Sequence, residues 1–157
     1  MGATPATFGQ RLMAFLVDFV VYMALVVPGV VLVIIGSAIG GGFGGLIAVL
    51  GALLVFAAFF AGIYLIVVVQ GTTGQSPGKR TQGIQLQKSD TKQPVGAGLA
   101  IGRWLLAGLF SNFCYIGHLW MLFDPEKKTL YDKILNAEVV PGPKGGVMPL
   151  FPNGKPF

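Results

Sequence analysis

Two long apolar runs constrain this chain more than any other feature of its sequence. Residues 12–36 contain one charged side chain, Asp18, and residues 46–69 contain none. An α-helix rises about 1.5 Å per residue, so either run can cross the roughly 30 Å hydrocarbon core of a bilayer. Only 11% of all residues are charged, against about a quarter in ordinary globular domains. We therefore expect an all-α integral membrane protein with two full transmembrane helices.

The segment that joins the two runs is rich in glycine. Residues 36–45 contain six glycines and no charged residue. Glycine lowers helix stability because its backbone is so free in the unfolded chain. We therefore expect residues 36–45 to form a short turn on the far side of the membrane.

The following segment, residues 70–98, is polar and predicts an aqueous loop. Within it, Ile84-Gln85-Leu86-Gln87 alternates apolar and polar residues, the period of a half-buried strand. The later run Ala137–Val140 is a candidate partner. The chain is thus expected to form a membrane domain over residues 1–140, with a possible short two-stranded β ladder at the cytoplasmic surface.

A third apolar segment, residues 99–123, has two interpretations. Its length favours a straight span. Charge favours a re-entrant hairpin that turns near Ser111-Asn112, because the N-terminus, the 70–98 loop and the chain after Phe123 carry one, four and five Lys or Arg residues, while residues 36–45 carry none. Positively charged segments tend to remain in the cytoplasm. Both interpretations stay open, with a cytoplasmic N-terminus and the plasma membrane as the expected location.

Residues 141–157 form a tail with five prolines in seventeen residues, a pattern that excludes a helix or a central strand. One interpretation is a disordered tail. The other is an extended arm that docks on a neighbouring protein. The apolar residues that would dock are Val147, Met148, Leu150, Phe151 and Phe157.

Two charged residues lie within the apolar segments. A carboxylate at the position of Asp18 is costly in hydrocarbon unless it has a partner, and Arg103, near the start of the third segment, is a basic candidate. An Asp18–Arg103 pair would be an interhelical clamp. Alternatively, Asp18 is a proton or cation site. Arg11, nearer the end of the first run, can extend to the headgroups.

The remaining motifs favour neither catalysis nor a cofactor. Cys114 and His118 share a helix face, but two ligands are too few for a zinc site. The sequence Gly74-Gln75-Ser76-Pro77-Gly78-Lys79-Arg80 departs from the phosphate-binding loop pattern, because Arg80 follows the lysine. We expect a turn there that brings Lys79 and Arg80 to anionic lipid headgroups. The net charge of +5 then indicates a membrane surface rather than nucleic acid.

The motifs together resemble the RDD family of small bacterial membrane proteins. Arg11-Leu12-Met13-Ala14-Phe15-Leu16-Val17-Asp18 is similar to the family's opening R-x-x-A-x-x-x-D, and residues 74–80 with Gly83-Ile84 are similar to its loop after the second helix. Leu130-Tyr131-Asp132-Lys133-Ile134 is similar to its closing motif, although Tyr131 stands where histidine is common.

The resemblance has consequences for both fold and function. It implies that Arg11, Asp18 and Asp132 are the residues for which the family is named. It also implies three membrane segments, and transport is the activity customarily suggested, with cation/proton exchange for some members.

Two functions remain in view from the sequence. The first is a non-catalytic accessory subunit packed against a larger membrane complex, such as respiratory or transport machinery. It would contact membrane lipids and other membrane protein subunits, and it needs no cofactor. The second is an oligomeric cation/proton transporter in which Asp18 titrates and Arg103 sets its affinity.

Overall fold

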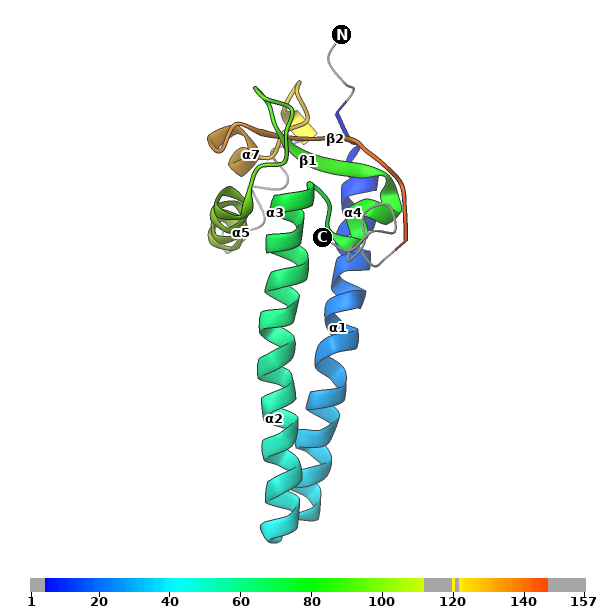
Figure 1. The fold of residues 1–157 in the computed structure, drawn as a ribbon, viewed down its shortest axis with the longest axis vertical. Helices are drawn as coiled ribbons and strands as arrows, with labels where there is room; N and C mark the ends of the chain where they lie inside the picture. Colours follow the sequence, from blue (N-terminus) through cyan, green and yellow to red (C-terminus); the bar gives the residue numbers. More distant parts are fainter. Residues whose placement is uncertain (1–4, 112–119, 121, 147–157) are drawn as a thin grey trace.

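The computed structural model describes residues 5–111, 120 and 122–146. Figure 1 shows two long antiparallel helices that form a stem, with a small head of short elements at one end. The stem consists of α1 (Phe8–Ile39) and α2 (Gly41–Ile63), and α2 continues into the head as the π-helix η1 (Tyr64–Val68) and α3 (Val69–Thr73). The other elements of the head are α4 (Pro77–Gln82), β1 (Ile84–Lys88), α5 (Ala97–Ser111), α7 (Leu130–Ile134) and β2 (Ala137–Pro141).

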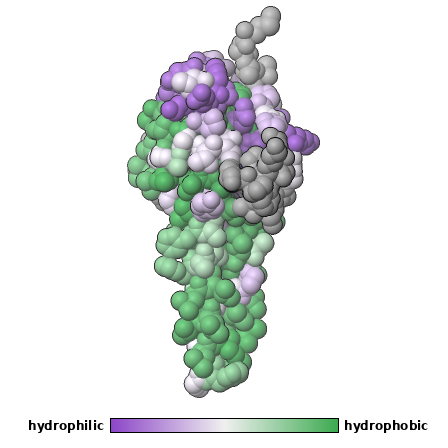
Figure 2. All heavy atoms as spheres, viewed as in Figure 1, coloured by the Kyte–Doolittle hydropathy of each residue, from purple (hydrophilic) through white to green (hydrophobic). Residues whose placement is uncertain are grey.

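The stem matches the expectation of two membrane-spanning helices. The helices Phe8–Ile39 and Gly41–Thr73 are both long and apolar enough to cross a bilayer. Figure 2 shows a stem surface of hydrophobic residues, whereas the hydrophilic residues gather on the head. The chain therefore has the surface of a membrane protein, with its polar part at one end.

A capping box fixes the beginning of α1. Thr7 accepts a hydrogen bond from the backbone N–H of Gln10, and the Gln10 side chain accepts one from the backbone N–H of Thr7. Because the first N–H groups of a helix lack partners within it, this exchange stabilises the first turn. The helix thus begins four residues before the apolar run.

The expected turn over residues 36–45 is wrong in extent, because both helices run through it and meet at Gly40. The glycines let the two backbones approach closely. A Cβ atom on Gly36 would lie 2.4 Å from the backbone nitrogen of Ala48, and one on Gly51 would lie 2.6 Å from the carbonyl oxygen of Gly29. Close packing in lipid selects such small residues. Here it outweighs the low intrinsic helix propensity of glycine.

The expected β ladder is present. Strands β1 and β2 pair antiparallel, with Leu86 opposite Val139. Both side chains are buried in the hydrophobic core of the head. The outer edges are partly occupied, because the N–H of Ala6 donates to Val139 and the N–H of Leu86 donates to Gly74. The ladder therefore ties three distant parts of the chain together.

The ladder also determines where the third apolar segment starts and ends. Strand β1 precedes α5, and β2 follows α7. Since the strands pair, the start of α5 and the start of α7 both lie at the head end of the stem. The described helix in this segment, α5, has 15 residues, or about 22 Å of length.

The glycine contacts predict a position-dependent effect of added methyl groups. We expect Gly36→Ala to lower the stability of the folded protein by about 1–3 kcal/mol, because the new methyl group overpacks a backbone contact. Gly45→Ala is the matched control on α2, since a Cβ there meets nothing within 4 Å, and it should be neutral or stabilising by at most about 1 kcal/mol. Thermal unfolding in mild detergent measures both. Equal effects would contradict the glycine-packed interface.

Candidate functional site

One buried carboxylate connects three parts of the chain. Asp132 in α7 is fully buried. Its Oδ2 accepts a hydrogen bond from Arg11 Nη1 at 3.0 Å, and its Oδ1 accepts one from Arg103 Nε at 2.7 Å. Arg11 lies near the start of α1, and Arg103 lies in α5. Asp132 therefore joins the first span to both α5 and α7.

Neighbouring groups hold this arrangement in place. The guanidinium of Arg11 also donates through Nη2 to the carbonyl oxygen of Lys127 at 2.9 Å. The guanidinium of Arg103 lies over the Tyr131 ring, 4.8 Å from its centroid, at a distance typical of cation–π contacts. Thr129 caps α7 by accepting a hydrogen bond from the N–H of Asp132. The carboxylate is thus fixed from both sides.

The electrostatics of this group favour the charged form of Asp132. Burial alone would raise its pKa, but the positive charges of Arg103 and Arg11, with the hydrogen bond from Arg103, lower the pKa to about 2. The pKa of Tyr131 is raised, chiefly by its own burial. Asp132 therefore remains ionised at physiological pH and acts as a permanent anion between two cations.

A second carboxylate joins the first span to α4. Asp18 accepts a hydrogen bond from the Ser76 hydroxyl at 2.6 Å and another from the backbone N–H of Gly78 at 2.7 Å. Ser76 is also the N-cap of α4. A Cβ on Gly78 would lie 1.9 Å from the carbonyl oxygen of Ala14, so only glycine permits this approach. The motif residues Ala14 and Asp18 thus form the surface of α1 on which α4 packs.

Lys79 points into the same region. With the Gln70 amide oriented to satisfy its neighbours, Gln70 donates to the carbonyl oxygen of Ile66 at 2.8 Å and accepts from Lys79 Nζ at 2.9 Å. Burial, aided by repulsion from Arg103, lowers the pKa of Lys79 to about 8. The ammonium group therefore ties α4 to the end of the second span.

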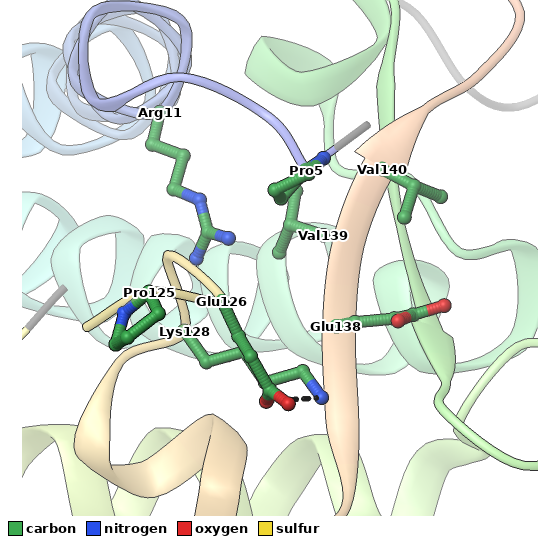
Figure 3. A pocket seen from close by; sticks show the side chains of 8 residues that line it. All are labelled: Pro5, Arg11, Pro125, Glu126, Lys128, Glu138, Val139 and Val140. Atoms are coloured by element: carbon green, nitrogen blue, oxygen red, sulfur yellow. Dashed lines mark ion pairs between the residues drawn. The ribbon is translucent and has the colours of Figure 1, made fainter. Parts of the chain in front are cut away.

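A shallow cleft of about 250 Å³ lies beside Arg11 on the head. Figure 3 shows Arg11 and Lys128 on its wall together with Glu126 and Glu138. Lys128 pairs with Glu126 at 3.1 Å, and Glu138 pairs with Lys92 at 2.7 Å. The opposite charges largely satisfy one another, so the cleft has no strong preference for a ligand of one charge. Among the described residues, no group of three His, Cys, Asp or Glu side chains could hold a metal ion.

The structure corrects the expected pairing of Asp18 with Arg103. Arg103 is paired with Asp132, and the oxygens of Asp18 are occupied by Ser76 and Gly78. The physical reason is that a hydroxyl and a backbone N–H satisfy a buried carboxylate without any cation. The structure does bring Arg11 and Asp132 together, but it places Asp18 in a separate hydrogen-bonded group.

The other predicted residues divide into two sets. Lys79 and Arg80 are half-buried in α4, and Arg80 also accepts a hydrogen bond from Gly145 through its carbonyl oxygen. Their contact with headgroups stays a prediction. The expected docking residues of the tail lie outside the described part of the chain, as do Cys114 and His118; the docking residues are Val147, Met148, Leu150, Phe151 and Phe157.

Sequence reasoning missed the roles of Ser76, Thr129 and Gln70. Ser76 and Thr129 each begin a short helix, and Ser before Pro77 is a recognisable helix start. That signal could have located Ser76. No local pattern marks Gln70, because its partner Lys79 is brought to it by the tertiary fold.

The motif residues thus occupy the contacts between the stem and the head. A model of the RDD family matches residues 5–136. The chain belongs to the RDD family. In this RDD protein, the opening motif supplies Arg11, Ala14 and Asp18 to two different contacts.

Three curated relatives are similar over part of their length. The proline-rich antigen homologs of Mycobacterium tuberculosis strains CDC 1551 / Oshkosh and H37Rv are each 36% identical over 72 residues, which are 46% of this chain and 30% of the relative. The proline-rich antigen of Mycobacterium leprae strain TN is 36% identical over 72 residues, or 29% of its length. The match covers less than a third of these relatives. No solved structure matches the chain.

The separate pairing of the two carboxylates predicts which mutations couple. Asp132→Asn leaves both arginines without their anion and should destabilise the protein by about 3–5 kcal/mol. Arg103→Gln leaves Asp132 paired with Arg11 alone, so it should destabilise the protein by less. The double variant should lose less stability than the sum of the losses in the two single variants. Asp18→Asn with Arg103→Gln is the matched control and should be close to additive, since these residues do not touch each other. Thermal unfolding of the single and double variants gives both coupling energies. A strong coupling of Asp18 with Arg103 would contradict the separate pairing and support the Asp18–Arg103 clamp.

Proposed function

We propose that this RDD protein is a non-catalytic accessory subunit that packs, through its stem, against a larger membrane complex. The observation that carries the proposal is a ridge of aromatic rings in the middle of the second span. Phe56 and Phe60 lie with their ring centroids 4.8 Å apart, and Phe59 lies 5.5 Å from Phe60. All three side chains are at least 44% exposed.

The position of this ridge favours a protein neighbour. Tryptophan and tyrosine gather at the two ends of a span, where their polar groups reach water. Phe56, Phe59 and Phe60 lie near the centre of the helix Gly41–Thr73, so they have no such role at the membrane interface. Rigid aromatic rings offer large contact areas with specific geometry, which suits packing against other side chains. The ridge is therefore the proposed contact with the partner.

The ionisable groups support an architectural role. Asp132 is held by two arginines, and Asp18 is held by Ser76 and Gly78. Each carboxylate joins elements that are distant in sequence. Groups engaged in this way stabilise the fold, so they are poorly suited to exchange partners during every transport cycle.

The second candidate is an oligomeric cation/proton transporter that uses Asp18. One observation favours it. Lys79, in the α4 turn that Asp18 holds, has a pKa lowered to about 8 by burial, so protons could be exchanged there near physiological pH. A pathway would require several copies, because two spans alone enclose little space.

The topology that we propose places the N-terminus and the whole head in the cytoplasm of a plasma-membrane protein. Its support is charge. The described Lys and Arg residues all lie near the head end of α1 or on the head itself, and the connection at Gly40 carries none. Positive residues are enriched in cytoplasmic segments. The paired strands support the same arrangement, because both ends of the third apolar segment then lie on one side.

The accessory role predicts site-specific crosslinks in cells. A photoreactive phenylalanine analogue at Phe56 or at Phe60 should produce an adduct of the same mass, identified by mass spectrometry as one other membrane protein. Leu54 is the control, since it is 48% exposed but lies about 160° around the helix from Phe56. It should not give that adduct.

The same experiment separates the two functions. Adducts with lipids only would contradict the accessory role. Adducts with a second copy of the chain would favour the oligomeric transporter. In that case Asp18→Asn should abolish pH-dependent cation flux in proteoliposomes.

The topology predicts which positions an impermeant maleimide reaches in intact cells. Cys114→Ser removes the native thiol, and Cys114 is the one cysteine of the chain. In that background, Lys144→Cys and Thr91→Cys, at exposed head positions, should stay unlabelled until the cells are opened. Gly42→Cys, in the open connection of the stem, should be labelled at once. Labelling of Lys144→Cys in intact cells would overturn the arrangement.

A further inference from the structure

One face of α5 is apolar and uncovered. Its outward residues recur at four-residue spacing, and such residues share one face of a helix. Ile101, Leu105 and Leu109 are 40%, 59% and 58% exposed, and the neighbouring Trp104 is 43% exposed. The face lies on the head, in a helix too short by itself to cross a bilayer, because 15 residues extend about 22 Å.

The opposite face of α5 fixes the direction in which the apolar face points. Ala100 is buried, and a Cβ on Gly71 would lie 2.8 Å from the Cβ of Ala100. The N–H of Gly96 donates to the carbonyl oxygen of Gly71, and Arg103 is bound to Asp132. Rotation of α5 would break these contacts. The apolar residues are therefore held outward by the fold.

The axis of α5 is roughly perpendicular to the long axis of the stem. Figure 1 shows α5 nearly end-on, while α1 and α2 extend along the vertical direction. A helix in this orientation does not descend toward the far end of the stem. It is therefore neither the first half of a straight span nor the descending arm of a re-entrant hairpin.

The surface around α5 continues the lipid-facing surface of the stem. Figure 2 shows hydrophobic residues extending from the stem onto one side of the head, with hydrophilic residues gathered toward the end remote from the stem. Trp120, Leu122 and Phe123 are 44%, 55% and 86% exposed. Tryptophan prefers the boundary between headgroups and acyl chains. The boundary between polar and apolar surface thus passes along this side of the head.

We propose that α5, with Trp120, Leu122 and Phe123, is an interfacial platform that lies in the plane of the bilayer and inserts its apolar face into the leaflet on the head side. The occupant of this face is lipid, at the boundary of headgroups and acyl chains. A helix that exposes an apolar face, with its other face held by the rest of the protein, is suited to lie in the membrane interface. The proposal rests on the stem crossing the membrane.

The platform gives the third apolar segment a role other than crossing. The described residues of α5 hold Arg103 against Asp132 on one side and offer the exposed apolar face to lipid on the other. Because the platform is rigidly joined to α7 and to the end of the second span, it fixes the depth of the head relative to the bilayer. In this way the platform limits how deeply the stem can insert into the bilayer.

Depth-resolved fluorescence tests the platform. The chain has two tryptophans, so Trp104→Phe with Trp120→Phe gives a background without tryptophan. Single tryptophans are then introduced as Ile101→Trp and Leu109→Trp, and quenching is measured in vesicles of phosphatidylcholine brominated at different acyl positions. The matched controls are Phe19→Trp and Val27→Trp on α1, which are exposed and also eight residues apart.

The two helices should behave differently. Ile101→Trp and Leu109→Trp should be quenched most by the shallowest bromines and to the same depth, whereas Val27→Trp should lie about 12 Å deeper than Phe19→Trp. A Leu109→Trp depth about 12 Å greater than that of Ile101→Trp would overturn the platform, since the segment would then descend. Absence of quenching at both α5 positions would also overturn it, because protein would cover the face.

Two further measurements keep these outcomes distinct. Trp120→Phe alone leaves native Trp104 as the reporter, so the shallow depth is checked without any substitution on α5. Equal depths for Phe19→Trp and Val27→Trp would show that α1 does not cross the bilayer. That result would remove both the platform and the proposed topology, whereas failure of the α5 pair alone removes only the platform.

Discussion

The structure of the head depends on the contact of Asp132 with two arginines. The lost hydration of a fully buried charged carboxylate must be offset by cations or by other hydrogen-bond donors, and Asp132 has two arginines. Arg11 comes from the start of the first span and Arg103 from the third apolar segment. Because the two basic groups arrive from opposite sides, the position of α7 is determined by both of them.

The position of α7 also determines where strand β2 begins. Four residues after Asp132, Asn136 takes a positive φ of 50° and reverses the chain. Strand β2 then begins at Ala137 and pairs with β1. The ladder is therefore as much a consequence of the ion pairs as of strand propensity. An isolated two-stranded ladder is marginal in water, and here its inner residues Leu86 and Val139 pack into the core beneath it.

Patterns of hydrophobicity allowed much of this fold to be predicted. The spans follow from long apolar runs with at most one charged residue, and the ladder follows from the alternation in Ile84-Gln85-Leu86-Gln87. The partners of Asp18 did not follow, because the prediction looked for a cation. Ser76 and Gly78 meet the same need with a hydroxyl and a main-chain N–H, and a sequence does not mark which N–H groups are available. The turn predicted over residues 36–45 was wrong in extent for a related reason. The glycines there allow close contact between two helices, and that contact depends on the tertiary fold.

Asp18 also marks the level on α1 at which the head gives way to the uncovered stem. Helix α4 covers Ala14 and Asp18, so a head element packs against the first turns of α1. The part of α1 beyond Asp18, from Phe19 to Ile39, has 21 residues, or about 31 Å, which matches the hydrocarbon core. In the proposed topology the carboxylate lies at the edge of the apolar layer, beneath α4. On the second span the same level corresponds to η1, where the π-helix precedes Gln70 and its contact with Lys79. Since π-helical turns interrupt the regular α-helix ladder, the second span changes its backbone geometry where it leaves the lipid and enters the head.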